Sequence, residues 1–211
     1  MDENFKKSIL LRLNSAAEAL RKNQMDAYVV ESKEELLEKL SSMIDKKDTV
    51  YSGGSATLKE TGVIDMLMNG YDYYYRGRTD KNGNVMDVLR DAFNGDWYLT
   101  SSNAVTLNGE LYNVDGNANR VAAMSFGPKN VVVVVGYNKI VKDIDEAAER
   151  VRGIAAPVNC VRLDKKTGCR ASGHCIDCHS PDRICCVATV HTFQREKGRI
   201  KVFLLPEELG Y

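Results

Sequence analysis

The sequence predicts an α/β fold in which a mainly parallel β-sheet is flanked by helices. Short stretches of β-forming residues alternate with helical stretches of about ten residues or more, the rhythm of βαβ units. The run NVVVVVG at 130–136 is continuously apolar, as in a strand buried on both faces. The chain has 211 residues, 44% of them apolar and 27% charged, which is typical of a globular protein. We therefore expect one domain over residues 1–211.

The first half of the chain alternates helix and strand. Apolar residues recur at helical spacing over 5–23, which predicts a helix within an N-terminal segment 1–25. Ser32 and Glu35 form a capping-box pattern at the start of a helix over 33–44. Strands are expected at 26–31, 48–54, 71–76 and 96–105, and further helices at 57–70 and 84–93.

The second half adds a hairpin and three strands. The pair Asn108-Gly109 predicts a β-hairpin between 104–107 and 110–114. Helices are expected on either side of the buried strand, at 118–126 and 143–155. Two apolar stretches close the chain, at 186–193 and 199–206, and the turn-forming QREKG between them predicts a terminal hairpin on the sheet edge.

Composition argues against two classes of partner. Twenty-nine basic side chains balance twenty-nine acidic ones, so the chain lacks the positive field with which nucleic-acid binders attract phosphates. The longest wholly apolar run is far shorter than the roughly 20 residues that span a bilayer, and the N-terminus does not resemble a secretory signal. We expect no nucleic acid, no membrane, a cytoplasmic location and, as the commonest assembly, a homodimer.

A first candidate site is YSGGSATLKETG at 51–62. Glycines that follow a parallel strand let the backbone approach a ligand at the carboxyl edge of the sheet. Gly53, Gly54, Ser55 and Thr57 fit this role, although no dinucleotide or P-loop motif is present. The alternative is a plain strand-to-helix turn in which Thr57 and Glu60 form a capping box.

A second candidate site lies within 100–124, which is rich in amide, carboxylate and guanidinium groups. Such groups recognise small polar anions. Turn chemistry alone explains the Asn-Gly and Asp-Gly pairs, but not the polar groups inside a helical stretch. The candidate ligand-binding residues here are Asn103, Asn113, Asp115, Asn119 and Arg120, and Lys139 lies where it could reach the same pocket.

A cysteine-rich flap over 160–186 interrupts the α/β pattern. Cys169, Cys175, Cys178 and Cys185 are candidate metal ligands, since clustered thiolates bind zinc or an iron–sulfur cluster. In a reducing compartment the alternatives are a set of reduced, redox-sensitive thiols or a C-x-x-C redox centre. The spacing of these cysteines matches no diagnostic zinc or iron–sulfur pattern, so a metal site, a set of reduced thiols and a redox centre all remain possible interpretations.

The residues also carry a family resemblance. The stretch SSNAVTLNGELYNVDGNANRVAAMSFGPKNVVVVVGYNKIV, with YSGGSATLKETG before it and SPDRICC and GRIKVFLLPEELGY after it, resembles the LUD-domain (DUF162) family of lactate-utilisation C-type proteins, in a compact anaerobe-type form. The resemblance implies a fold like that of ribose-5-phosphate isomerase, glucosamine-6-phosphate deaminase and the CoA transferases. It also implies a role beside an iron–sulfur oxidoreductase that converts lactate to pyruvate.

Within that superfamily, SSNAVTLNGELYNVDG is similar to a segment of methylthioribose-1-phosphate isomerase whose aspartate does acid/base chemistry. Asn103 stands in place of that aspartate, and an amide does not exchange a proton near neutral pH. Asp115 and Glu60 remain as candidate catalytic carboxylates. We expect a protein that binds a small anionic metabolite of lactate or organic-acid utilisation. The alternatives are an electron-transfer or assembly partner that uses the flap, and a sugar-phosphate isomerase or CoA-transferase-like enzyme.

Overall fold

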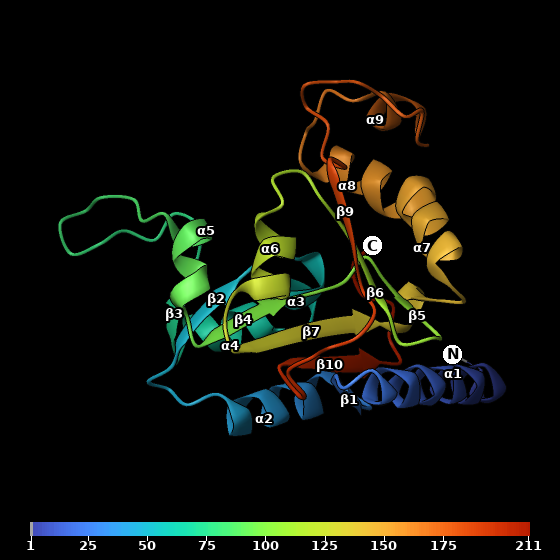
Figure 1. Ribbon diagram of the computed structural model, residues 1–211, viewed down its shortest axis with the longest axis horizontal. Helices are drawn as coiled ribbons and strands as arrows, with labels where there is room; N and C mark the ends of the chain where they lie inside the picture. The colour runs from blue at the N-terminus through green and yellow to red at the C-terminus, as the bar shows by residue number, and fades with distance from the viewer. Residues whose placement is uncertain (1) are drawn as a thin grey trace.

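The computed structural model describes residues 2–211 and contains a six-stranded sheet and a smaller four-stranded one (Figure 1). Every neighbouring pair in the larger sheet is parallel, so the predicted α/β fold is confirmed. In spatial order its strands are β1 (Asp26–Val29), β10 (Ile200–Leu205), β7 (Asn130–Gly136), β4 (Trp97–Thr100), β2 (Thr49–Ser52) and β3 (Asp72–Tyr74).

The strand β7 shows why this sheet needs helices on both faces. Val131 and Val133 pack in one apolar cluster together with α1 (Glu3–Lys22) and α6 (Asn119–Phe126). The alternate residue Val132 packs in a second cluster, with side chains from α2 (Lys33–Met43), α3 (Ala56–Glu60) and α4 (Val63–Met68). Successive side chains of a strand point to opposite faces, so the run of five valines at 131–135 requires both faces of the sheet to be covered.

The helix expected over 57–70 is divided into two. Gly62 has a φ of 75°, in the left-handed region that glycine adopts without strain, and it ends α3 and precedes α4. Ser55 caps α3, because its side chain accepts a hydrogen bond from the backbone N–H of Leu58 at 3.2 Å. The capping box of Thr57 and Glu60, the alternative to a ligand-binding role, is therefore absent, and both side chains have other partners. The helix expected over 84–93 is likewise shorter, as α5 (Val88–Asp91) with one 3-10 turn (Ala92–Asn94).

The smaller sheet holds the predicted hairpin. Strands β5 (Ala104–Thr106) and β6 (Leu111–Asp115) pair antiparallel across Asn108-Gly109, as expected. Strands β8 (Ile140–Val141) and β9 (Val187–His191) complete the order β8-β5-β6-β9. The single strand expected over 96–105 is thus two strands in different sheets, because residues 101–103 turn the chain from β4 into β5.

The expected terminal hairpin on the sheet edge is wrong. β10 lies inside the six-stranded sheet, parallel to both β1 and β7, whereas β9 pairs with β6 in the other sheet. The burial of the two strands agrees with these positions. Five of the six residues of β10 are buried, as suits an interior strand, while β9 is mostly exposed or half-buried and lies at an edge.

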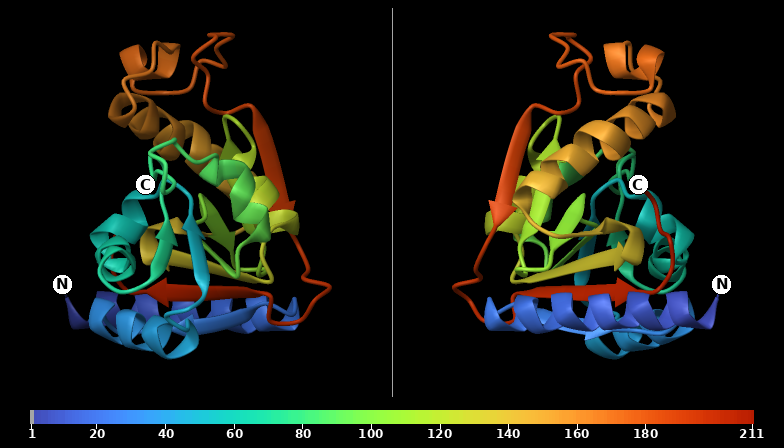
Figure 2. Two further views of the ribbon diagram at one scale, coloured as in Figure 1. Left: turned by 90° about the vertical axis from the view of Figure 1, so that its left-hand side faces the viewer. Right: turned by 90° about the vertical axis from the view of Figure 1, so that its right-hand side faces the viewer.

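A long helical arm carries the flap over the larger sheet. It runs from α7 (Ile144–Arg150) through a π-helical turn (Val151–Ala155) into α8 (Ala156–Arg162), and the short α9 (Gly168–Ser172) follows in the flap. Figure 2 shows the flap at the opposite end of the molecule from α1 and α2. Across residues 2–211, no helix combines the length and the apolar character that crossing a membrane would require.

Candidate functional site

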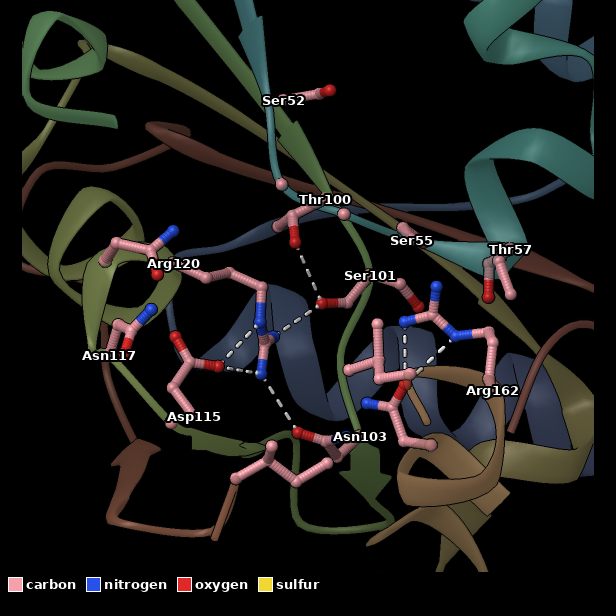
Figure 3. A pocket seen from close by; sticks show the side chains of 18 of the residues that line it. Ser52, Ser55, Thr57, Thr100, Ser101, Asn103, Asp115, Asn117, Arg120 and Arg162 are labelled. Atoms are coloured by element: carbon pink, nitrogen blue, oxygen red, sulfur yellow. Dashed lines mark hydrogen bonds and ion pairs between the residues drawn. The ribbon is translucent and has the colours of Figure 1, made fainter. Parts of the chain in front are cut away.

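A cavity of about 830 Å³ opens at the carboxyl ends of β2 and β4, between the larger sheet and the flap (Figure 3). Its sheet side is formed by residues 52–57, 100–103 and 114–117, and residues of 159–165 and 181–184 line it from the arm and flap. Ligands of open α/β sheets bind at this edge, where the strands end and loops converge.

The structure brings most of the sequence-predicted ligand-binding residues to this cavity. The residues that line it are Gly53, Gly54, Ser55, Thr57, Asn103, Asp115, Asn119, Arg120 and Lys139. Asn113 is fully buried behind the wall, where its side-chain oxygen accepts a hydrogen bond from Arg120 at 2.5 Å. The two motifs, 51–62 and 100–124, lie far apart in sequence, but they meet because β2 and β4 are neighbours in the sheet.

The guanidinium of Arg120 is surrounded by hydrogen-bond acceptors (Figure 3). We call Arg120 together with Ser101, Asn103, Asn113 and Asp115, which accept hydrogen bonds from it, the Arg120 cluster. Asp115 Oδ1 accepts hydrogen bonds from Nε at 2.9 Å and lies 2.6 Å from Nη2. Nη1 donates to the carbonyl oxygen of Ser101 at 2.9 Å and Nη2 to Asn103 Oδ1 at 3.0 Å. Because all the guanidinium nitrogens are engaged, Arg120 holds the cavity wall together and has no donor left for a ligand.

The other oxygen of Asp115 ties this cluster to the fold. Asp115 Oδ2 accepts a hydrogen bond from the backbone N–H of Val121 at 2.9 Å, which fixes the start of α6 against the end of β6. The carboxylate is 8% exposed and is neutralised by Arg120. Asp115 therefore has the contacts of a structural ion pair, and its prediction as a catalytic carboxylate stays a prediction.

Gly53 allows the backbone to pass close to this cluster. A Cβ at this position would lie 3.0 Å from the hydroxyl oxygen of Tyr98 and 3.3 Å from Cδ of Arg120. At the neighbouring Gly54, no atom would come within 4 Å of a Cβ. The first glycine is thus needed for packing, whereas the second faces open space in the cavity.

Lys139 lies at the bottom of the cavity with no carboxylate at hydrogen-bond distance among residues 2–211. Only 3% of the residue is exposed, and Nζ donates to Thr57 Oγ1 at 2.9 Å and to Ser101 Oγ at 3.1 Å. Burial lowers the pKa of this amine to about 7, and the nearby Arg150 and Arg120 lower it as well, while Glu60 raises it. Near neutral pH a large fraction of the amine is therefore uncharged.

Glu60, the second candidate carboxylate, lies outside the cavity lining. Its Oε2 accepts a hydrogen bond from the backbone N–H of Gly210 at 2.7 Å, and Thr57 Oγ1 donates to the carbonyl oxygen of Leu209 at 3.3 Å. These bonds place the segment 209–211 against α3, so that Tyr211 becomes part of the cavity wall. The catalytic role of Glu60 stays a prediction.

More basic than acidic side chains line the cavity. Seven basic side chains line it against three acidic ones, although basic and acidic residues balance over the whole chain. The basic residues are Lys59, Arg76, Arg120, Lys139, Arg162, Lys165 and Arg183, and the acidic residues are Asp65, Asp115 and Asp182. Arg162 and Arg183 come from the arm and flap, far in sequence from the predicted motifs, so no local pattern marks them as site residues.

The flap thiols lie near one another without forming a metal site. Burial, with a smaller contribution from Cys169 and Cys185, raises the pKa of Cys160 to about 11, although a hydrogen bond with Thr167 acts in the opposite direction. Burial also raises the pKa of Cys185. Arg183 lowers this pKa, whereas Cys175 and Cys178 raise it. Within residues 2–211, no three histidine, cysteine, aspartate or glutamate side chains are grouped so that they could hold a metal ion. The predicted ligands therefore do not converge, and the iron–sulfur cluster or zinc ion stays a prediction.

Fold and cavity together define an α/β protein with a basic pocket at the carboxyl edge of a parallel sheet. The model of the LUD domain family matches residues 13–205, and the chain belongs to this family. A crystal structure of a DUF162 family protein from Deinococcus radiodurans is similar over 95% of this chain and 98% of that chain, with a TM-score of 0.53 and 16% sequence identity. A comparison with curated proteins finds no match.

Proposed function

We propose that this LUD domain protein binds a small organic anion, a carboxylate or a phosphate, in the cavity between the sheet and the flap. The surplus of basic over acidic side chains around the cavity carries the proposal. Such a surplus inside a concave site attracts anions, since low-dielectric walls concentrate the field. The family resemblance makes lactate and related organic acids the first ligands to test, in a protein that acts beside an iron–sulfur oxidoreductase.

Arg162 is a cavity-lining cation that a bound anion could contact. Its Nε and Nη2 donate to Asn159 Oδ1 at 3.0 and 2.6 Å, which fixes the guanidinium but leaves it without a carboxylate partner in residues 2–211. A hydrogen bond to a charged partner contributes about 1.5–3 kcal/mol, so its loss should weaken binding by roughly tenfold or more.

Calorimetric titration with lactate, pyruvate and inorganic phosphate tests the proposal. We expect saturable binding of at least one of them to the wild type and a weaker affinity for Arg162→Gln. Arg152→Gln is the matched control, because Arg152 is exposed on the same helical arm and does not line the cavity. The proposal fails if no anion binds, or if the two variants lose affinity equally.

A second proposal is non-catalytic: the flap docks on an iron–sulfur oxidoreductase. Ile176 favours it, because this apolar side chain is 54% exposed between Cys175 and Cys178. Co-purification with such an oxidoreductase should be lost in the double variant Cys175→Ser, Cys178→Ser and also in Ile176→Ser. A complex that survives all of these substitutions would rule out docking through the flap.

A further inference from the structure

We propose that Lys139 is a nucleophile that forms an imine with the carbonyl carbon of an anion bound in the cavity. The ligand class is an anion that also carries an aldehyde or ketone, as 2-oxo acids and open-chain sugar phosphates do. The inference rests on the proposed function, since an anion must first occupy the pocket, and it adds a covalent step at a residue that contacts the ligand.

The hydrogen bonds around Nζ fit an uncharged amine. Thr57 Oγ1 donates its own hydrogen to the carbonyl oxygen of Leu209, and Ser101 Oγ donates to the carbonyl oxygen of Ser102 at 3.4 Å. Both hydroxyl oxygens are therefore acceptors for Lys139, at 2.9 and 3.1 Å. A neutral amine has two N–H groups, which these oxygens satisfy, and one lone pair, which remains free.

An ammonium group would fit this position less well. Its third N–H finds no acceptor among residues 2–211, and a buried unpaired donor costs about 1–3 kcal/mol or more when it is charged. The charged groups that face Nζ are Arg120 from α6, Arg150 from α7 and Glu60 from α3. Of these, the one carboxylate is engaged by the backbone N–H of Gly210. Burial beside other cations is a known way to activate a lysine as a nucleophile.

The backbone around Lys139 is held in place, so the amine keeps its position in the cavity. Lys139 ends the short turn that follows β7. The side chain of the preceding Asn138 accepts a hydrogen bond from Leu209 N at 3.1 Å and donates one to Gly210 O at 3.1 Å. Nζ is thus within hydrogen-bond distance of both Thr57 on α3 and Ser101 after β4, and Figure 3 labels these two residues in the cavity lining. A nucleophile at a fixed position is what covalent catalysis requires.

The chemistry balances without an oxidant or a metal. The lone pair of Nζ forms a bond to the carbonyl carbon, the carbonyl oxygen takes up a proton, and the amine gives one up. In the carbinolamine that results, the C–O bond breaks, and the hydroxyl group leaves as water together with the remaining hydrogen of the nitrogen, so that a C=N bond remains. Ser101 and Thr57 lie at hydrogen-bond distance from Nζ and can pass the protons.

Reductive trapping tests this step on the full-length chain. The protein is incubated at pH 7.5 with pyruvate or ribose 5-phosphate and sodium cyanoborohydride, which reduces an imine to a stable amine, and is then mapped by peptide mass spectrometry. We expect at least tenfold more adduct at Lys139 than at the exposed Lys81 and Lys197, and none at position 139 in Lys139→Arg. Equal labelling of all lysines, or no adduct at Lys139, overturns the inference.

Lactate separates this inference from the proposed function, because it is an anion without a carbonyl group. If lactate and pyruvate both bind but pyruvate leaves no adduct at Lys139, the anion site stands and the imine is refuted. If lactate, pyruvate and inorganic phosphate all fail to bind and no adduct forms, both proposals fail. The wild-type peptide map decides the point even where a substitution at this buried position impairs folding.

Discussion

A half-buried arginine and a buried lysine face the same cavity and are held in different ways. Arg120 is paired with the carboxylate of Asp115 and surrounded by amide and carbonyl oxygens. Lys139 contacts two hydroxyl oxygens and no carboxylate. A buried charge is costly unless it is paired, so the paired arginine stabilises the fold, whereas the unpaired lysine readily loses its proton. We infer that Arg120 stabilises the fold and that Lys139 takes part in the chemistry of the site.

The largest expected effect comes from breaking the Arg120 cluster. Arg120→Met leaves Asp115 buried without its partner, and removing one member of a buried ion pair costs about 3–5 kcal/mol. We expect the free energy of unfolding in urea to fall by that amount. Arg152→Met is the control on an exposed arginine and should change it by less than about 0.5 kcal/mol. Equal stability of the two variants would show that Arg120 is not structural.

A second difference between Lys139 and Arg120 is expected in how the stability of the protein depends on pH. The pKa of Lys139 is about 7 in the folded chain, against roughly 10.4 for an unfolded lysine. Between these values the unfolded state binds the extra proton, so the free energy of unfolding should rise with pH from about 7 toward 10, by at most ~1.4 kcal/mol per unit. Lys139→Met should lack this rise and be at least as stable as the wild type at pH 7.

Urea titrations of both proteins at pH 6.5, 8 and 9.5 measure the difference. Groups that titrate in both proteins cancel when the two curves are subtracted, so the remaining slope belongs to Lys139. Curves that run parallel over the whole range would mean that the lysine keeps an ordinary pKa in the folded protein. In that case the contrast with Arg120 would be lost.

Sequence reasoning found the parts of the site that local patterns encode. Asn103, Asp115 and Arg120 were predicted together because a hairpin and the helix after it bring them close along the chain. The arginines of the arm and flap and the Tyr211 side chain were missed, because they reach the cavity only through tertiary packing. The position of β10 was missed for a related reason: an apolar stretch does not show which strands it will pair with.

The smallest effect concerns the two adjacent glycines that the sequence treats alike. Gly53→Ala would place a methyl group 3.0 Å from the buried Tyr98 hydroxyl and 3.3 Å from Arg120, so we expect a loss of about 1–2 kcal/mol from overpacking. Gly54→Ala meets no atom within 4 Å, and its φ lies outside the left-handed region, so stability should stay equal or rise by about 0.4–1 kcal/mol.

The effect on ligand binding should be the reverse: Gly54→Ala, which keeps its stability, should be the variant that loses affinity for the anion. The Gly54 methyl group would extend into the cavity and take up space next to the anion, whereas the Gly53 methyl group would press on the Arg120 cluster behind the wall. Gly54→Ala is therefore expected to weaken anion binding without loss of stability, measured by calorimetry and urea unfolding on the same samples. If Gly53→Ala is the one that keeps its stability, Tyr98 and Arg120 must be able to move aside, and the Arg120 cluster is less rigid than its hydrogen bonds indicate.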